Sequence, residues 1–156
     1  MIEVDIPGFT RFRFQHLVLD VNGTIAKDGR LLEGVQELLA ALRPKLDIHL
    51  VTADTHGNQE VIDKTLELTA VRIPSHNQVH AKLDYIERLG VDKVVAVGNG
   101  ANDAAMLEHA ALGIVIIGPE GSAVESLLKA KVVVSDIRTA LELLLYPKRL
   151  MATLRR

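Results

Sequence analysis

Short apolar runs alternate with longer helical patterns along almost the whole chain, and this alternation constrains the fold more than any other feature. The runs are mostly rich in β-branched residues and are followed by small or polar residues, as expected for strands buried on both faces. They cover residues 16–19, 48–52, 70–73, 93–97, 113–117 and 132–134. Strands of this kind belong to parallel sheets that carry helices on both faces.

The segments between these runs carry apolar residues at helical spacing, which predicts helices over residues 31–42, 59–68, 79–89, 102–111, 122–128, 136–145 and 149–154. Ser122 and Asp136 are suitable N-cap residues, and Gly90 suits the position after a helix end. Repeated strand–helix alternation predicts an α/β fold, a three-layer, doubly wound and mostly parallel sheet. The chain has 156 residues, so a single domain over residues 1–156 is expected.

The two ends of the chain depart from this rhythm. Residues 2–6 and 11–14 flank Pro7-Gly8, which predicts an antiparallel β-ribbon or an edge strand within residues 1–14. Residues 148–156 follow Pro147 and predict a basic helical tail, whose charges complement the dipole of a helix end. These basic residues are Lys148, Arg149, Arg155 and Arg156.

Composition excludes several classes of function. The chain has no cysteine, which excludes disulfides and thiolate catalysis. A formal net charge of −2 and an aromatic content of 3% argue against nucleic-acid binding. No apolar run approaches the roughly 18 residues of a membrane span, and the N-terminal residues do not resemble a signal peptide. We therefore expect a cytoplasmic protein without a membrane partner.

Ligands of doubly wound sheets bind beyond the carboxyl ends of the strands, so the residues that follow each run are the candidate site. The first run leads into Asp20-Val21-Asn22-Gly23-Thr24. A carboxylate in this place can attack phosphorus and form an acyl phosphate, which divides one difficult displacement into two easier ones. The alternative is structural, because Asn-Gly between apolar residues is also a strong β-hairpin signal.

Two further polar groups follow in chain order. Thr52 ends the second run, before Ala53 and Asp54, and its hydroxyl can donate to a phosphoryl oxygen; a helix cap is the alternative. Lys82 stands in the third helical segment and can neutralise phosphoryl charge as a point charge. A solvated helix lysine is the ordinary alternative, and His80 is a second candidate for the same place.

The fourth run ends in a glycine-rich loop, Gly98-Asn99-Gly100-Ala101-Asn102-Asp103. Glycines let the backbone approach a ligand, and Asn99 and Asp103 offer oxygen atoms to a hard cation. The alternative is a capped strand-to-helix turn. After the fifth run, Gly118-Pro119-Glu120-Gly121 is most simply a turn, with a substrate contact as the alternative.

Together these groups resemble the haloacid dehalogenase superfamily of aspartate-nucleophile phosphotransferases, over about residues 15–135. Pro74-Ser75-His76 ahead of Lys82, and the segment from Gly98 to Leu107, look most like soluble relatives of the phosphorylation domain of P-type ATPases. The resemblance implies that Asp20 is the nucleophile, that Thr52 binds the phosphoryl group, and that Lys82 balances their charge.

The same resemblance implies a magnesium-dependent phosphohydrolase or phosphotransferase that acts on a small phosphorylated substrate. The Mg²⁺ ligands that it implies are Asp20, the backbone carbonyl of Asn22, Asn99 and Asp103. The substrate contacts that it implies are Gly23, Thr24, Ala53, Asp54 and Asn102.

Two departures from the family pattern bear on activity. Asn22 stands where the phosphatase branches have an aspartate that acts as general acid and base, a function worth about 10²–10⁴-fold in rate. Slow turnover is therefore expected, although His56 can be considered as a substitute proton donor. Asn99 replaces a second aspartate, which weakens metal binding without abolishing it. Both substitutions also support the alternative of a catalytically degenerate module that binds a phosphorylated ligand or partner without turnover.

No cap domain is expected, because only residues 25–30 separate the first motif from the next predicted helix. An uncovered site needs a partner subunit or a large substrate to exclude water, so a homo-oligomer is expected, with the N-terminal ribbon as a candidate contact. A nucleotide-binding oxidoreductase is the remaining alternative. It is disfavoured because no Gly-x-Gly-x-x-Gly follows the first strand.

Overall fold

The computed structural model describes residues 1–53 and 57–156, and its centre is a parallel sheet. The strands of this sheet are β3 (His16–Asp20), β6 (Asp47–Thr52), β7 (Val71–Arg72), β8 (Val94–Gly98), β9 (Leu112–Ile116) and β10 (Val132–Val134). They lie in the order β10-β9-β8-β3-β6-β7. The chain leaves β3 toward β6 and later returns to β8 on its other side, so the topological switch point lies at β3.

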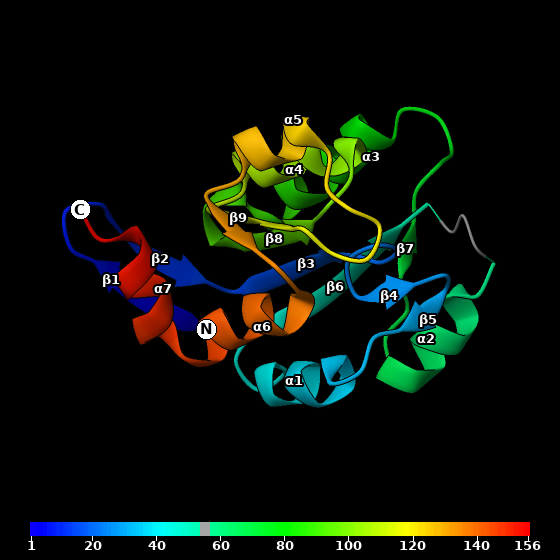
Figure 1. Cartoon of the computed structure of the whole chain (residues 1–156), viewed down its shortest axis with the longest axis horizontal. Coiled ribbons are helices and arrows are strands. Elements are labelled where there is room, and N and C mark those ends of the chain that lie inside the picture. The colour runs from blue at the N-terminus through cyan, green and yellow to red at the C-terminus, as the bar shows by residue number, and fades with distance from the viewer. Residues whose placement is uncertain (54–56) are drawn as a thin grey trace.

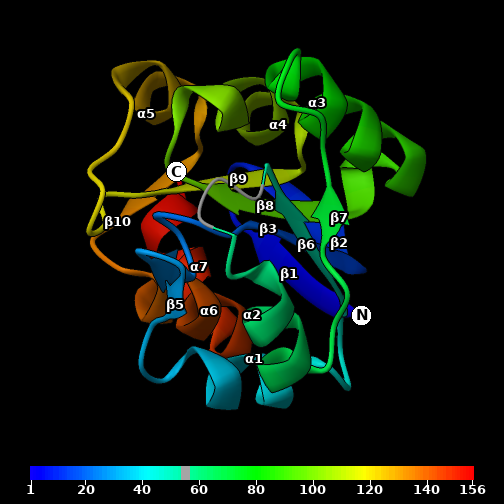
Figure 2. The same ribbon diagram turned by 90° about the vertical axis from the view of Figure 1, so that its right-hand side faces the viewer.

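Helices cover both faces of the sheet (Figures 1 and 2). One face carries α1 (Val35–Leu42), α2 (Gln59–Leu66) and α6 (Ile137–Leu145). The other face carries α3 (Gln78–Leu89), α4 (Ala104–His109) and α5 (Val124–Lys129). This arrangement confirms the predicted three-layer, doubly wound α/β fold, and no cap domain lies over the sheet in the described part of the chain. None of the helices in the described ranges has the length and apolar character needed to cross a bilayer.

The alternation of side chains along each strand divides the core between the two faces. Leu17 and Leu19 of β3 pack into the cluster that contains α1 and α6, whereas Val18 packs into the cluster that contains α3 and α4. All three side chains are fully buried. Successive residues of a strand point to opposite faces, so a strand covered on both sides must be apolar throughout.

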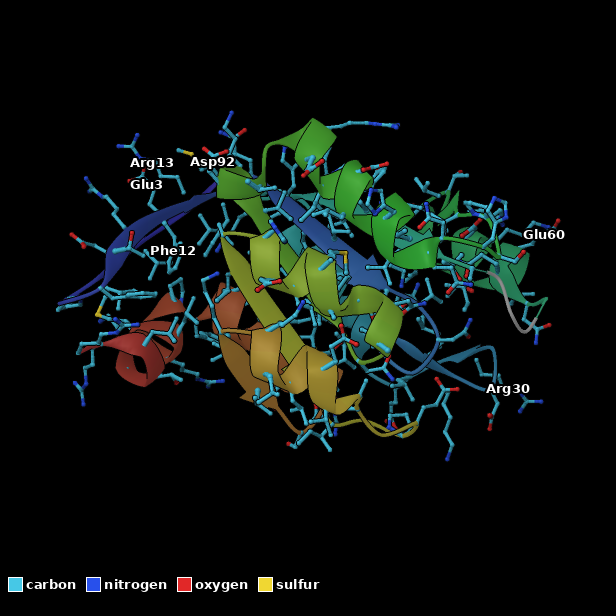
Figure 3. The ribbon with its side chains drawn as sticks, turned by 90° about the horizontal axis from the view of Figure 1, so that it is seen from above. Glu3, Phe12, Arg13, Arg30, Glu60 and Asp92 are labelled. Carbon is cyan, nitrogen blue, oxygen red and sulfur yellow. The ribbon has the colours of Figure 1, made fainter. Side chains whose placement is uncertain are left out.

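The ends of the chain pack together at one end of the sheet. β1 (Ile2–Ile6) and β2 (Thr10–Phe14) form a separate antiparallel pair, as predicted, and α7 (Pro147–Leu154) packs against β1. The ribbon buries alternate residues against the core, while Glu3 and Arg13 pair on its outer face at 3.3 Å. Figure 3 shows this pair at the opposite end of the molecule from Arg30. The last helix begins at Pro147 rather than at residue 149, because proline is favourable in the first turn.

A short hairpin was not predicted. β4 (Ala26–Lys27) and β5 (Arg30–Leu31) pair through a two-residue turn at Asp28 and Gly29, whose φ angles are 50° and 75°. Two positive φ angles are typical of a type I′ hairpin turn. The helix predicted from residue 31 therefore begins later, at Val35, after the hairpin and Gly34.

The predicted helix caps have different outcomes. Asp136 caps α6 by accepting a hydrogen bond from Thr139 N at 3.1 Å, and Gly90 follows the end of α3. The prediction for Ser122 is wrong, because α5 begins at Val124 after Ala123, and the buried Oγ of Ser122 has no hydrogen-bond partner.

Candidate functional site

A polar cavity opens at the carboxyl ends of β3, β6 and β8. Its lining residues are Asp20, Asn22, Thr52, Ala53, Gln78, Asn99, Gly100, Asn102 and Glu120. Asp20 is opposite Val51 in the register of β3 and β6, so Thr52 stands one residue beyond it on the neighbouring strand. The cavity therefore lies at the switch point of the sheet, where ligands of such folds bind.

The chain after β3 makes a tight loop rather than a hairpin. The carbonyl of Val21 accepts hydrogen bonds from the amides of Thr24, Ile25 and Ala26 at 2.9–3.1 Å. Gly23 has a φ of 83°, which favours glycine. Both neighbours of β3 are parallel strands, so the hairpin interpretation of Asn22-Gly23 is wrong. The loop leaves Asp20 at the cavity, with 8% of its surface exposed.

Lys82 joins two carboxylates beneath the cavity. Its Nζ donates to Asp20 Oδ1 and to Asp103 Oδ1, each at 2.6 Å, and its side chain has no exposed surface. Lys82 and Ile86 are the buried residues of α3, one turn apart on the face that packs on the sheet. His80, the alternative candidate, is exposed.

This cluster holds two negative charges and one positive charge in a buried place. Burial, followed by the nearby charge of Asp103, raises the pKa of Asp20 from 3.8 to about 6, although Lys82 and Thr24 oppose this shift. Burial by itself would lower the pKa of Lys82, but the two carboxylates raise it, so the ammonium stays charged. A carboxylate with a raised pKa in a cavity is a candidate functional group.

Asp103 is held on all sides by protein donors. Its Oδ2 accepts from the backbone amides of Asn99 and Gly100, both at 3.0 Å, and its Oδ1 accepts from Lys82. A Cβ on Gly98 would lie 2.5 Å from Asp103 Cγ, so glycine is needed there. Asp103 has no exposed surface. This geometry favours positioning of Lys82 and of the loop over the metal-ligand role that the family resemblance implies.

Asn99 and Asp20 are joined through the hydroxyl of Thr24. Thr24 Oγ1 donates to Asp20 Oδ2 at 3.0 Å and also lies 3.3 Å from Asn99 Oδ1. The other side of the amide, Asn99 Nδ2, donates to the carbonyl of Gly121 at 3.2 Å. Two oxygen atoms, from Asp20 and Asn99, thus converge on the buried hydroxyl of Thr24.

Asn22 is placed beside Asp20 with an unused acceptor. Its Oδ1 is buried and has no hydrogen-bond partner. A side-chain amide neither gains nor loses a proton near neutral pH. This group can therefore orient a ligand but cannot act as a general acid or base.

The remaining predicted residues divide between three places. Thr52, 2% exposed, and Ala53 line the cavity, and Asn102 lies on its rim, where its Nδ2 donates to Gln78 Oε1 at 2.7 Å. Gly23 and Thr24 belong to the loop below it. Asp54 and His56 lie outside the described residues.

Comparison with known proteins identifies the family. Residues 2–111 match the haloacid dehalogenase-like hydrolases. The chain belongs to this family. An uncharacterized protein of Methanocaldococcus jannaschii is 46% identical over 79 residues, which are 48% of this chain and 85% of that protein. A probable copper-exporting P-type ATPase of Archaeoglobus fulgidus is 33% identical over 108 residues, which are 68% of this chain but only 13% of the ATPase.

Solved structures of the haloacid dehalogenase superfamily share the fold. A 3-deoxy-D-manno-octulosonate 8-phosphate phosphatase of Moraxella catarrhalis, in complex with magnesium and phosphate ions, aligns with a TM-score of 0.66 at 17% identity. The alignment covers 91% of this chain and 94% of that one. A phospho-aspartyl intermediate analogue of phosphoserine phosphatase aligns with a TM-score of 0.67 at 16% identity, over 83% and 98% of the two chains.

The donor set in this hydrolase fits a hard divalent cation. No group of three or more His, Asp or Glu side chains in the described ranges is arranged to hold a metal. Asp20, Asn22 and Asn99 line the cavity and carry carboxylate, amide and backbone carbonyl oxygens. All are oxygen atoms, and Mg²⁺ ordinarily takes one or two carboxylates and keeps several waters. The unpartnered Oδ1 of Asn22 is a further acceptor, which suits a bound water.

Two cavity side chains were not among the predicted site residues. Gln78 is the first residue of α3, and no sequence pattern distinguishes it from a surface glutamine. Glu120 belongs to the turn after β9, for which a contact with the substrate was the less favoured interpretation. The direction in which this turn folds, which brings Glu120 to the cavity, is seen only in the structure.

Proposed function

We propose that this hydrolase is a magnesium-dependent phosphohydrolase that forms an aspartyl phosphate on Asp20. The observation that carries the proposal is the contact of Lys82 Nζ with Asp20 Oδ1 at 2.6 Å, below a cavity that also exposes Thr52 and Asn99. A structural ion pair alone does not require its carboxylate to open into a polar cavity at the switch point.

Two displacements at phosphorus make up the reaction. In the first, an Asp20 oxygen bonds to phosphorus while the bond to the leaving oxygen breaks, and the leaving group departs with the electron pair. In the second, water attacks phosphorus and the bond to the Asp20 oxygen breaks, which returns the carboxylate and releases phosphate and a proton. Magnesium supplies charge neutralisation at the phosphoryl oxygens when it is bound.

The protein residues orient these steps. Lys82 keeps the reacting Asp20 oxygen in place and offsets the negative charge of the phosphoryl group. Thr24 holds the other oxygen of Asp20 at 3.0 Å, and in this proposal Thr52, which lines the cavity, donates to a phosphoryl oxygen. The fixed geometry removes part of the entropic barrier to attack.

Asn22 makes turnover slow in this proposal, because it cannot protonate a leaving alkoxide or deprotonate the attacking water. Substrates with good leaving groups, such as acyl phosphates, aryl phosphates and phosphoanhydrides, are least affected. The same residue favours the second candidate function, a module that binds a phosphorylated ligand without turnover. The homo-oligomer that would cover the open cavity, the single-domain organisation and the cytoplasmic location stay predictions.

Phosphate release from acetyl phosphate and p-nitrophenyl phosphate tests the proposal. We expect slow, Mg²⁺-dependent release by the wild-type protein, none by Asp20→Asn, and an unchanged rate for Asp92→Asn, an exposed carboxylate of η1 (Val91–Lys93). Release that is equal in the wild type and Asp20→Asn contradicts the proposal. No release, combined with binding of inorganic phosphate in a titration, supports the binding module instead.

A further inference from the structure

The turn after β9 brings a carboxylate to the cation side of the cavity. Gly121 N donates to the carbonyl of Gly118 at 3.0 Å, which closes a four-residue turn around Pro119 and Glu120. Figure 1 shows this segment, in yellow, turning back beside β4 at the end of the sheet. Glu120 lines the same cavity as Asp20 and Asn99.

Glu120 lies close to Gly23, in the loop that follows Asp20. A Cβ on Gly23 would clash with Glu120 Oε2, and it would lie 2.5 Å from Asn99 Nδ2 and 2.9 Å from Asn99 Oδ1. The carboxylate of Glu120 and the amide of Asn99 therefore occupy the same small space above Gly23. Gly118 packs on this loop as well, since its Cβ would lie 3.1 Å from the carbonyl oxygen of Gly23.

The Asn99 amide fastens the turn in this position. Asn99 Nδ2 donates to the Gly121 carbonyl at 3.2 Å, and the backbone carbonyl of Asn99 accepts from Ala123 N at 2.8 Å. Ser126 Oγ adds a hydrogen bond to the Gly100 carbonyl at 2.6 Å. An aspartate at position 99 has no N–H to donate and would set its charge against the Gly121 carbonyl. The amide thus holds the segment that carries Glu120, while its oxygen lies 3.3 Å from the Thr24 hydroxyl that donates to Asp20.

We propose that Glu120 completes the cation site, supplying the carboxylate that position 99 lacks. The inference rests on the proposed function for the existence of this site. Asn99 and Glu120 together replace one acidic residue. The amide oxygen of Asn99 is a neutral ligand, and Glu120 supplies the second negative charge beside Asp20. Affinity for a hard cation rises with the number of charged ligands, so the two residues together restore what the amide by itself loses.

Titration calorimetry of the full chain with Mg²⁺ alone, without substrate, tests this role. We expect Glu120→Gln to raise the Kd for Mg²⁺ by about 10–100-fold or more, since loss of even an outer-shell partner of a metal site has an effect of this size. Glu125→Gln removes the same charge from the exposed first turn of α5 and should leave the Kd within about twofold of wild type. Urea unfolding of each variant checks that the fold is retained.

A double variant separates the charge of Glu120 from the integrity of the turn. Asn99→Asp in the Glu120→Gln background should recover most of the lost affinity, because it returns a carboxylate to the same space. A folded Glu120→Gln protein with the wild-type Kd overturns the inference. If that protein also forms phosphorylated Asp20 in a Mg²⁺-dependent way, the proposed function stands and the role of Glu120 alone fails. If the wild type neither binds Mg²⁺ nor becomes phosphorylated, the proposed function itself fails.

Discussion

Asp20 and Asp103 share one ammonium group: Lys82 Nζ lies 2.6 Å from an oxygen of each carboxylate. Three charges thus meet at one place, and Lys82 and Asp103 are buried there away from solvent. The cluster carries a net negative charge, which is unfavourable in a buried place unless a cation or a neutral variant relieves it.

Asp20→Asn should stabilise the metal-free protein at neutral pH. The pKa of Asp20 is raised from 3.8 to about 6, so the folded state holds a proton that the unfolded state releases between these values. Protonation of Asp20 therefore stabilises the folded state in full below pH 3.8, and this stabilisation is lost as pH rises through 6. The loss in the free energy of unfolding amounts to about 3 kcal/mol. Lys82 stays charged throughout, because its pKa is raised.

Urea unfolding in the presence of a chelator measures this effect. The stability advantage of Asp20→Asn over wild type should grow between pH 4 and pH 6 and then stay level to pH 8, since only the wild type carries the titrating group. A difference that does not depend on pH would contradict the buried-charge account.

Lys82→Met should destabilise the protein by about 3–5 kcal/mol, the cost of leaving buried carboxylates without their partner. Adding Asp103→Asn removes one of the two unpaired charges, so the double variant should recover part of the loss. Lys64→Met, on the exposed side of α2, should stay within about 0.5 kcal/mol of wild type. Equal stability of Lys82→Met and wild type would show that the cluster does not behave as described.

Mg²⁺ should stabilise the protein, because it relieves the excess negative charge at Asp20. At a concentration of about 100 times its Kd, the gain in unfolding free energy is about 2.7 kcal/mol. Asp20→Asn should lose most of this gain, which thermal unfolding with and without Mg²⁺ can show. An equal Mg²⁺ effect in both proteins would place the cation elsewhere.

Asn22→Asp should accelerate hydrolysis of p-nitrophenyl phosphate by about 10²-fold or more, because the carboxyl group adds the missing general acid and base. Steady-state kinetics over pH 5–8 measure the gain. An unchanged or lower rate in a folded variant would contradict the role assigned to position 22.

The sequence predicts the central sheet well because its strands are buried on both faces. β3 and β8 each lie within one residue of the predicted bounds, and the apolar β-branched pattern accounts for this. The hairpin of β4 and β5 has no such pattern, because strands of two residues are too short to show periodicity. Its one signal in the sequence is Asp28-Gly29, a dipeptide that favours type I′ hairpin turns.

The candidate site is predictable where it follows strand ends. Asp20, Thr52 and Asn99 meet because the carboxyl ends of neighbouring parallel strands share one edge of the sheet. The partners of Lys82 depend on the rotation of α3 against the sheet, which tertiary packing sets. The position of Glu120 depends on a turn folding back over Gly23, so the sequence indicates the turn without its direction.

Chemical trapping of residue 20 tests the central claim most directly. The protein is incubated with acetyl phosphate and Mg²⁺, quenched in acid, reduced with borohydride to convert any acyl phosphate to the alcohol, and digested for peptide mass analysis. The account predicts homoserine at position 20, absent from Asp20→Asn and from samples treated with chelator. Phosphate turnover that leaves Asp20 unmodified, or modification at another carboxylate, would contradict it.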